Sequence, residues 1–106
     1  MKEEITSKVL RAWLVAHKSV LILDIRPLHQ REVDYIEGSL HLDVYDRLVA
    51  GDLTVFDEVN FEPSVPLVTV CAGGKLSLTA AALLRMKGFN AVSLQGGMKA
   101  WKEEQQ

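Results

Sequence analysis

Cys71 has the neighbours best suited to chemistry, and it is the only cysteine among the 106 residues of the chain. It follows the apolar run 65–70 and precedes Gly73 and Gly74, after which a predicted helix begins near Ser77. Glycine backbones adopt positive φ at little cost, so successive N–H groups can point toward one centre. A helix N-terminus adds unpaired N–H groups and the positive end of the helix dipole. Such a setting stabilises a thiolate, so we predict a nucleophilic sulfur held by main-chain amides.

The same residues also have a purely structural interpretation. Free cysteine is among the most buried residue types and packs as a small hydrophobe, so Cys71 could be an inert part of the core. The two glycines could form only a tight turn between a strand and a helix. A strand end, paired glycines and a helix start within seven residues together favour the functional interpretation.

Composition excludes several other classes of protein. The chain has 12 Lys and Arg against 14 Asp and Glu, a formal net charge of −2, so a nucleic-acid-binding surface is not expected. A single cysteine rules out an intrachain disulfide and a zinc site built from cysteines. No run approaches the ~20 apolar residues of a membrane span, and residues 1–4 do not resemble a secretory leader. We expect one soluble, cytoplasmic domain over residues 1–106.

Apolar residues fall into short runs and longer periodic stretches. The runs 20–23 and 65–70 are apolar on successive residues, which predicts strands buried on both faces. Residues 39–42 and 91–94 are weaker strand candidates. Helices are predicted at 7–16, at 77–87, at 98–104 and, as one or two short turns, within 44–60.

The predicted helices also carry recognisable ends. Thr6 or Ser7 is the expected N-cap of the first helix, and Ser77 is the expected cap of the helix after Cys71. Gly88 is expected to end that helix, and Gly51 to interrupt the middle segment. Strands that alternate with helices predict a parallel sheet covered on both faces, in which reactive groups lie at the carboxyl ends of strands.

Four short motifs follow one another along the chain. Residues 21–26 form an apolar run that ends in Asp-x-Arg, and residues 34–39 are similar to Gly-His-Ile-Pro-Gly-Ala. Residues 71–77 are similar to Cys-x-x-Gly-x-Arg-Ser, and residues 94–101 match Leu-x-Gly-Gly-x-x-x-Trp. In this order, over almost the whole chain, the motifs resemble those of the rhodanese-like family, the thiosulfate sulfurtransferases. The resemblance implies a three-layer α/β/α fold with a five-stranded, mostly parallel sheet and a short extra strand near Ile5.

The resemblance also implies a chemistry. Cys71 would attack the outer sulfur of a donor such as thiosulfate, carry that sulfur as a persulfide, and pass it to a thiophilic acceptor such as cyanide or another thiol. The loop that would hold donor and persulfide comprises Ala72, Gly73, Gly74, Lys75, Leu76 and Ser77. The implied partners are a small sulfur donor and an acceptor, or a persulfide-carrying protein, and no metal or organic cofactor is implied. Asp24 and Arg26, at the neighbouring strand end, are expected to pair with each other or to support the loop.

The chain departs from the family pattern within the loop. Many active members have an arginine immediately before the serine, where this chain has Leu76, and Ala72 replaces another position that is frequently charged. Lys75 is the only cation in the loop. We therefore predict weak activity with the anion thiosulfate, and a better fit to a persulfide presented by a partner protein.

Two other functions compete with sulfur transfer. Phosphatases of the same fold need an arginine six residues after the cysteine, and this chain has Ser77 there, which disfavours phosphatase and arsenate reductase activity. A non-enzymatic interaction module is the alternative left open. No histidine forms a recognisable motif with Cys71. Trp13 and Trp101 are expected in the core, and residues 96–97 in a tight turn before the last helix.

Overall fold

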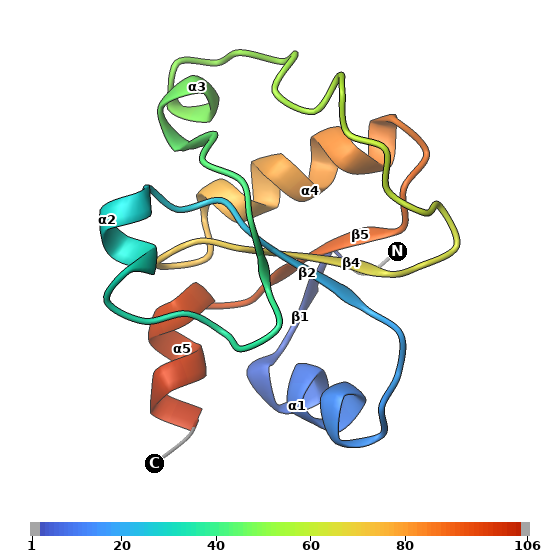
Figure 1. Cartoon of the computed structure of the whole chain (residues 1–106), viewed down its shortest axis with the longest axis vertical. Helices are drawn as coiled ribbons and strands as arrows, with labels where there is room; N and C mark the ends of the chain where they lie inside the picture. The colour runs from blue at the N-terminus through green and yellow to red at the C-terminus, as the bar shows by residue number, and fades with distance from the viewer. Residues whose placement is uncertain (1–2, 105–106) are drawn as a thin grey trace.

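The computed structural model describes residues 3–104. Its ten elements alternate along the chain as β1 Glu4–Ile5, α1 Ser7–Val15, β2 Leu21–Asp24, α2 Leu28–Arg31, β3 Leu40–His41, α3 Tyr45–Val49, β4 Leu67–Val70, α4 Leu76–Met86, β5 Ala91–Leu94 and α5 Gly97–Glu104. The five strands form one sheet in the order β1-β5-β4-β2-β3, and all four neighbouring pairs are parallel (Figure 1). The predicted α/β fold with a five-stranded, mostly parallel sheet is confirmed.

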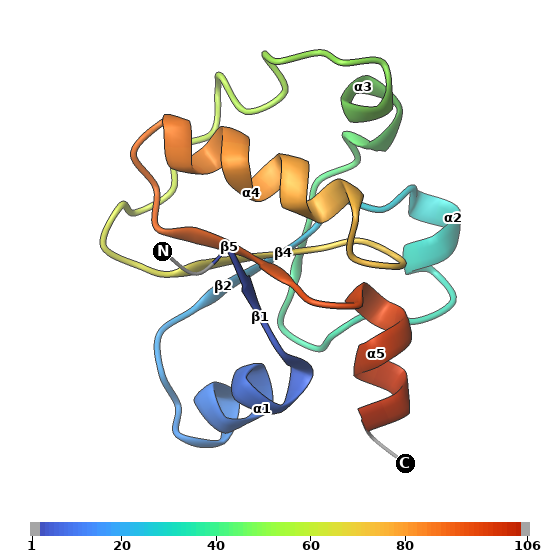
Figure 2. The same cartoon turned by 180° about the vertical axis from the view of Figure 1, so that it is seen from behind.

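Helices cover both faces of this sheet, with α3 and α4 on one side and α1 and α5 on the other (Figures 1 and 2). Successive strand side chains point to opposite faces, so Leu23 and Leu67 pack under α3 and α4 whereas Ile22 and Val68 pack against α1 and α5. Both faces are therefore apolar, which explains why β2 and β4 read as continuous apolar runs.

Most helix ends follow the predicted signals. Thr6 is the N-cap of α1, where its Oγ1 accepts a hydrogen bond from the Val9 N–H at 3.2 Å. Gly88, with φ of 95°, follows the end of α4, and Gly51, with φ of 83°, follows α3. One or two short helical turns were expected within residues 44–60, and the structure has one regular helix there, α3.

Two predictions about local structure were wrong or incomplete. Ser77 does not cap α4: the helix begins one residue earlier, Lys75 occupies the N-cap position without a side-chain bond, and Ser77 is fully buried. The short helix α2 was not predicted, because it holds four residues after Pro27 and buries none of them fully. Trp101 is buried and Trp13 packs against the same apolar cluster, as expected.

Among the helices of residues 3–104, none combines the length and the apolar character that crossing a bilayer requires.

Candidate active site

The sulfur of Cys71 is held by backbone amides immediately beyond strand β4. Its Sγ accepts hydrogen bonds from the N–H of Gly74 at 3.1 Å and from the N–H of Ser77 at 3.3 Å. Ser77 lies in the first turn of α4, so the positive end of the helix dipole points toward the same sulfur. Of the predicted cradle residues 72–77, these two supply the amides that reach Sγ. Amide donors of this kind favour a negatively charged sulfur.

Glycine is required where this loop meets the turn before α5. Gly74 has φ of 93°, and a Cβ there would lie 2.7 Å from the backbone nitrogen of Gly96. A Cβ on Gly97 would collide with the carbonyl groups of Cys71 and Ala72. The predicted tight turn at 96–97 is confirmed, with positive φ at both residues, and it also allows close packing against the cysteine loop.

The N-terminus of α5 holds the cysteine loop in place. The Met98 N–H donates to the Cys71 carbonyl at 2.9 Å, and the Lys99 N–H donates to the Ala72 carbonyl at 3.1 Å. Two N–H groups that a helix start leaves without intrahelical partners thus fix two carbonyls of the loop. With its carbonyls held from one side, the loop can turn its amides toward Sγ on the other.

Two buried serine hydroxyls continue the polar contacts behind the sulfur. Ser77 Oγ lies 3.2 Å from Cys71 Sγ and 2.6 Å from Ser93 Oγ, which comes from strand β5. Thr69 Oγ1 donates to the Ser77 carbonyl at 2.7 Å and fixes that turn to β4. A thiol donates to Ser77 Oγ, whereas a thiolate accepts from it and Ser93 can then donate to Ser77. The serine pair can therefore serve both protonation states of Cys71 by reversing its hydrogen bonds.

The sulfur lies beside an open cavity. Cys71 is only 4% exposed, and its inner side packs within the apolar cluster under α3 and α4. On the outer side is a cavity of about 410 Å³, whose lining residues are Tyr45, Cys71, Ala72, Gly73, Lys75 and Leu76. Lys75 is exposed at its rim, and Leu76 is half-buried against the core. A small substrate can approach the sulfur from this cavity, past one cation and an apolar wall.

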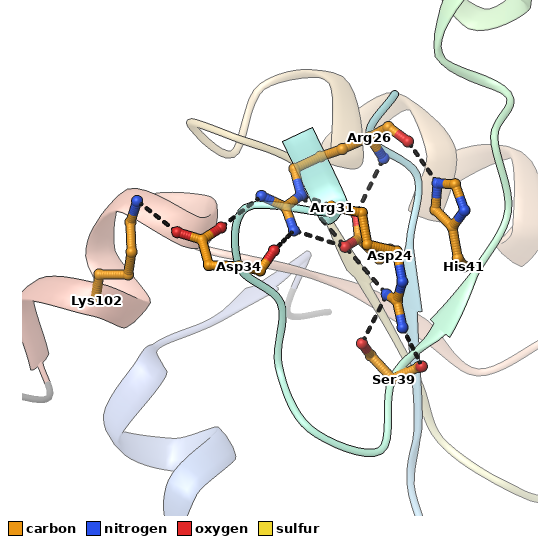
Figure 3. A network of polar contacts seen from close by, with 7 residues as sticks. All are labelled: Asp24, Arg26, Arg31, Asp34, Ser39, His41 and Lys102. Atoms are coloured by element: carbon orange, nitrogen blue, oxygen red, sulfur yellow. Dashed lines mark hydrogen bonds and ion pairs between the residues drawn. The ribbon is translucent and has the colours of Figure 1, made fainter. Parts of the chain in front are cut away.

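The neighbouring end of β2 carries a network of ion pairs (Figure 3). Arg26 and Asp24 are both buried and form a salt bridge at 2.8 Å, and Asp24 also pairs with Arg31 at 3.2 Å. Asp34 pairs with Arg26 at 3.1 Å and with Lys102 of α5 at 2.9 Å. Burial disfavours the charge on Arg26, but the hydrogen bonds and negative charges of Asp24 and Asp34 outweigh it and raise the pKa of Arg26 above its ordinary value.

The structure separates the two predicted roles of Asp24 and Arg26. Their expected pairing with each other is confirmed. Within residues 3–104, neither side chain donates or accepts a hydrogen bond with the loop 72–77, so any support for the loop is indirect. His41 belongs to this network as well, since its Nε2 lies 2.7 Å from the Arg26 carbonyl oxygen.

Sequence reasoning missed three contributors to the site. Ser93 and Tyr45 come from other elements, and no local pattern connects either of them to Cys71. The α5 amides do have a signal in the sequence, because residues 94–101 form one of the four motifs. Their spacing indicated a turn into a helix, but not that the helix start would face the cysteine loop.

Comparison with known proteins identifies the class to which this fold and site belong. The model of the Rhodanese-like domain family matches residues 6–104. The chain is 34% identical over 96 residues to the thiosulfate sulfurtransferase GlpE of Pseudomonas fluorescens, which covers 87% of this chain and 79% of that protein. It is 38% identical over 85 residues to GlpE of Pseudomonas aeruginosa, and the match covers 76% of this chain and 68% of that protein.

Solved structures agree with this class. A rhodanese-like domain protein from Staphylococcus aureus superimposes with a TM-score of 0.79 at 31% identity, covering 95% of this chain and 91% of the other. The human single-domain sulfurtransferase TSTD1 has a TM-score of 0.77 at 21% identity, over 98% of both chains, and supports the fold. The chain belongs to the rhodanese-like domain family, and it is a sulfurtransferase-type enzyme.

Proposed function

We propose that the chain moves a sulfane sulfur from a donor to a thiophilic acceptor through a persulfide on Cys71. The observation that carries this proposal is the pair of amides, from Gly74 and Ser77, that converge on Sγ. They stabilise negative charge on the attacking thiolate and again on the sulfur that leaves when the persulfide is consumed. The loop Ala72–Ser77 would hold the transferred sulfur.

With thiosulfate as the donor, the loading step balances without an oxidant or reductant. The Cys71 thiolate attacks the outer sulfur of thiosulfate, a new S–S bond forms, and the S–S bond of thiosulfate breaks. Sulfite leaves with the electron pair of the broken bond, and Cys71 carries a persulfide anion. In the second step a thiolate acceptor attacks the outer sulfur and Cys71 returns as the thiolate.

The loop favours a donor other than thiosulfate. Thiosulfate carries two negative charges, and the cavity beside Sγ offers one exposed cation, Lys75, together with the apolar Leu76. We therefore propose weak thiosulfate activity and a more efficient reaction with a small or protein-bound persulfide.

The cytoplasmic location and the limits 1–106 of the domain stay predictions.

The sulfurtransferase relatives disfavour the other function that the sequence left open, a non-enzymatic interaction module in which Cys71 is inert. The observation that favours it is the low exposure of Cys71, 4%, beside a half-buried Leu76. A binding module would keep Cys71 only as a core residue and would not accept sulfur from any donor.

Mass measurement of the intact protein separates the two candidates. After incubation with thiosulfate or an organic persulfide and removal of excess donor, the protein should gain about 32 Da, the mass of one sulfur atom bound as a persulfide. Because Cys71 is the only cysteine, the adduct needs no further mapping. The Cys71→Ser variant should gain nothing and should unfold at nearly the wild-type temperature. No adduct with several donors would overturn sulfur transfer in favour of the binding module.

A further inference from the structure

A second cavity borders the cysteine loop. Its volume is about 480 Å³, and it shares Ala72 and Gly73 with the cavity that contains Cys71. Its other lining comes from the β2–β3 connection and from α5, which lie on either side of the loop that follows β4 (Figures 1 and 2). The two cavities are therefore neighbours, and no function has been assigned above to the second.

Ala72 and Gly73 form the boundary between the two cavities, with small side chains and a backbone held by a hydrogen bond. Ala72 and Gly73 are exposed, and a Cβ added to Gly73 would meet no atom within 4 Å. The Ala72 carbonyl is held by the N–H of Lys99 at 3.1 Å. A ligand can thus lie across two residues that offer only a methyl group and a hydrogen, with its ends in different cavities.

The second cavity is positively charged although the chain has a net charge of −2. Its charged lining comprises Arg26, Lys99 and Lys102 against one carboxylate, Asp34. Asp24, which lies outside the lining, neutralises Arg26, so the two lysines leave one net positive charge. Asp34 is engaged by Arg26 and by Lys102, as Figure 3 shows. Lys99 takes part in none of the salt bridges found within residues 3–104.

Lys99 starts from the boundary itself, because its own backbone N–H is bonded to Ala72. Its exposed ammonium group is therefore tethered beside the point where a ligand would cross from the Cys71 cavity. Val33, 81% exposed, and Met98 add apolar surface to the same cavity. Cationic and aliphatic groups together suit an organic anion better than a small inorganic one.

We propose that the second cavity binds the carboxylate end of a peptide-like thiol acceptor whose sulfur reaches the persulfide on Cys71. This inference rests on the proposed persulfide function. The acceptor thiolate attacks the outer sulfur of the persulfide, forms a new S–S bond and breaks the old one. The electron pair of the broken bond stays on Cys71 Sγ, so the acceptor leaves as a persulfide and no other reactant is consumed. Lys99 fixes the acceptor by attracting its carboxylate.

Two synthetic peptides that differ in one carboxylate test this proposal. N-acetyl-Cys-Gly-Asp-amide and N-acetyl-Cys-Gly-Asn-amide have the same length. One glycine separates the cysteine from the residue that differs, a span of about 7 Å in an extended chain, close to that of the two boundary residues. Protein loaded with sulfur would be mixed with each peptide, and the peptide persulfide would be trapped and measured. We expect a KM about 2- to 5-fold lower for the aspartate peptide at low salt, with a similar kcat.

Charge variants on α5 locate the effect. Lys99→Glu should raise the KM of the aspartate peptide about 10-fold and leave that of the asparagine peptide nearly unchanged. Lys8→Glu, at an exposed position on α1 outside both cavities, is the matched control and should change neither value. Asp34→Asn removes the competing carboxylate and should lower the KM of the aspartate peptide.

The possible outcomes separate this inference from the proposed function. Equal KM values for both peptides in the wild type, or a Lys99→Glu change of equal size for both, would overturn the carboxylate subsite while leaving sulfur transfer intact. Failure of the loaded protein to transfer sulfur to either peptide, although it transfers to cyanide, would also overturn the subsite. No loading at all would overturn the proposed function itself.

Discussion

Two segments leave the carboxyl edge of the sheet side by side and use polar groups in opposite ways. We call residues 24–34, which begin at the end of β2, the β2 corner, and residues 71–77, which follow β4, the β4 corner. Asp24 and Val70 are partners in register on β2 and β4, so the residues that follow them leave the sheet together. After β2, the charges of Asp24 and Arg26 neutralise each other inside a closed network. After β4, the sulfur of Cys71 contacts two N–H groups and the Ser77 hydroxyl, and no side-chain charge contacts it within the described residues.

The difference teaches which kind of polar site is available for a reaction. In the β2 corner each carboxylate already has its cations, so a ligand would have to displace an internal partner. In the β4 corner main-chain dipoles stabilise negative charge on Cys71 without neutralising it, and the cavity leaves the sulfur's outer side open. The highly charged corner is therefore the structural one, and the corner with few charges is the reactive one.

Removal of Asp24 should give the largest effect on stability. Asp24→Ala leaves Arg26 and Arg31 beside an empty buried position, and breaking a buried ion pair from one side costs about 3–5 kcal/mol in unfolding free energy. Urea unfolding followed by tryptophan fluorescence measures this loss. Lys87→Gln, which breaks the exposed pair with Asp57, is the control and should cost less than about 1 kcal/mol. A loss for Asp24→Ala as small as that of the control would refute the structural role of the β2 corner.

Removal of the Ser77 hydroxyl should strongly affect the reactivity of Cys71. Hydrogen bonds to charged groups contribute about 1.5–3 kcal/mol, so Ser77→Ala should slow alkylation by iodoacetamide at neutral pH about 10- to 100-fold. Ser93→Ala acts through Ser77 and should have a smaller effect in the same direction. A merely loosened fold would expose the buried Cys71 and speed alkylation, so slower alkylation in both variants indicates a direct effect on the sulfur. Unchanged alkylation rates would mean that the serine pair does not stabilise the thiolate.

Introduction of a cation beside Cys71 should have a moderate effect on donor choice. Leu76→Arg places a guanidinium at the rim of the cavity, and one exposed charge pair, worth about 0.2–1 kcal/mol, should raise kcat/KM for thiosulfate by up to about 5-fold. The reaction with an organic persulfide, which carries one negative charge where thiosulfate carries two, should gain less. Leu53→Arg adds the same charge at an exposed position outside the cavity and serves as the control. Equal gains in both variants would show that net charge, rather than the loop, limits thiosulfate use.

The contrast between the corners also explains how far the sequence could be interpreted. Strands β2 and β4, helices α1 and α4 and the position of Cys71 follow from local patterns, because burial on two faces, helix periodicity and paired glycines each leave a signal within a few residues. Strand β1 was indicated by the family resemblance alone. Ser77 was assigned as a cap because serine is common at helix starts, but its hydroxyl faces Cys71 and Ser93 in the interior. Ser93 and the hydrogen bonds from α5 to the loop depend on tertiary packing between distant segments, which single-sequence patterns do not encode.

The pH dependence of the β2 corner should be the smallest of these effects. The hydrogen bond from Lys102, together with the contribution of Arg26, outweighs burial and lowers the pKa of Asp34 below 3.8. A carboxyl whose pKa is lower in the folded state stabilises the fold above the ordinary value, and this contribution is lost as the pH falls below it. Asp34→Asn should therefore reduce the unfolding free energy by about 1 kcal/mol at pH 7, and the difference from the wild type should shrink below pH 3.8. Urea titrations of both proteins across this range measure it, and a constant difference would show that Asp34 acts through packing instead of charge.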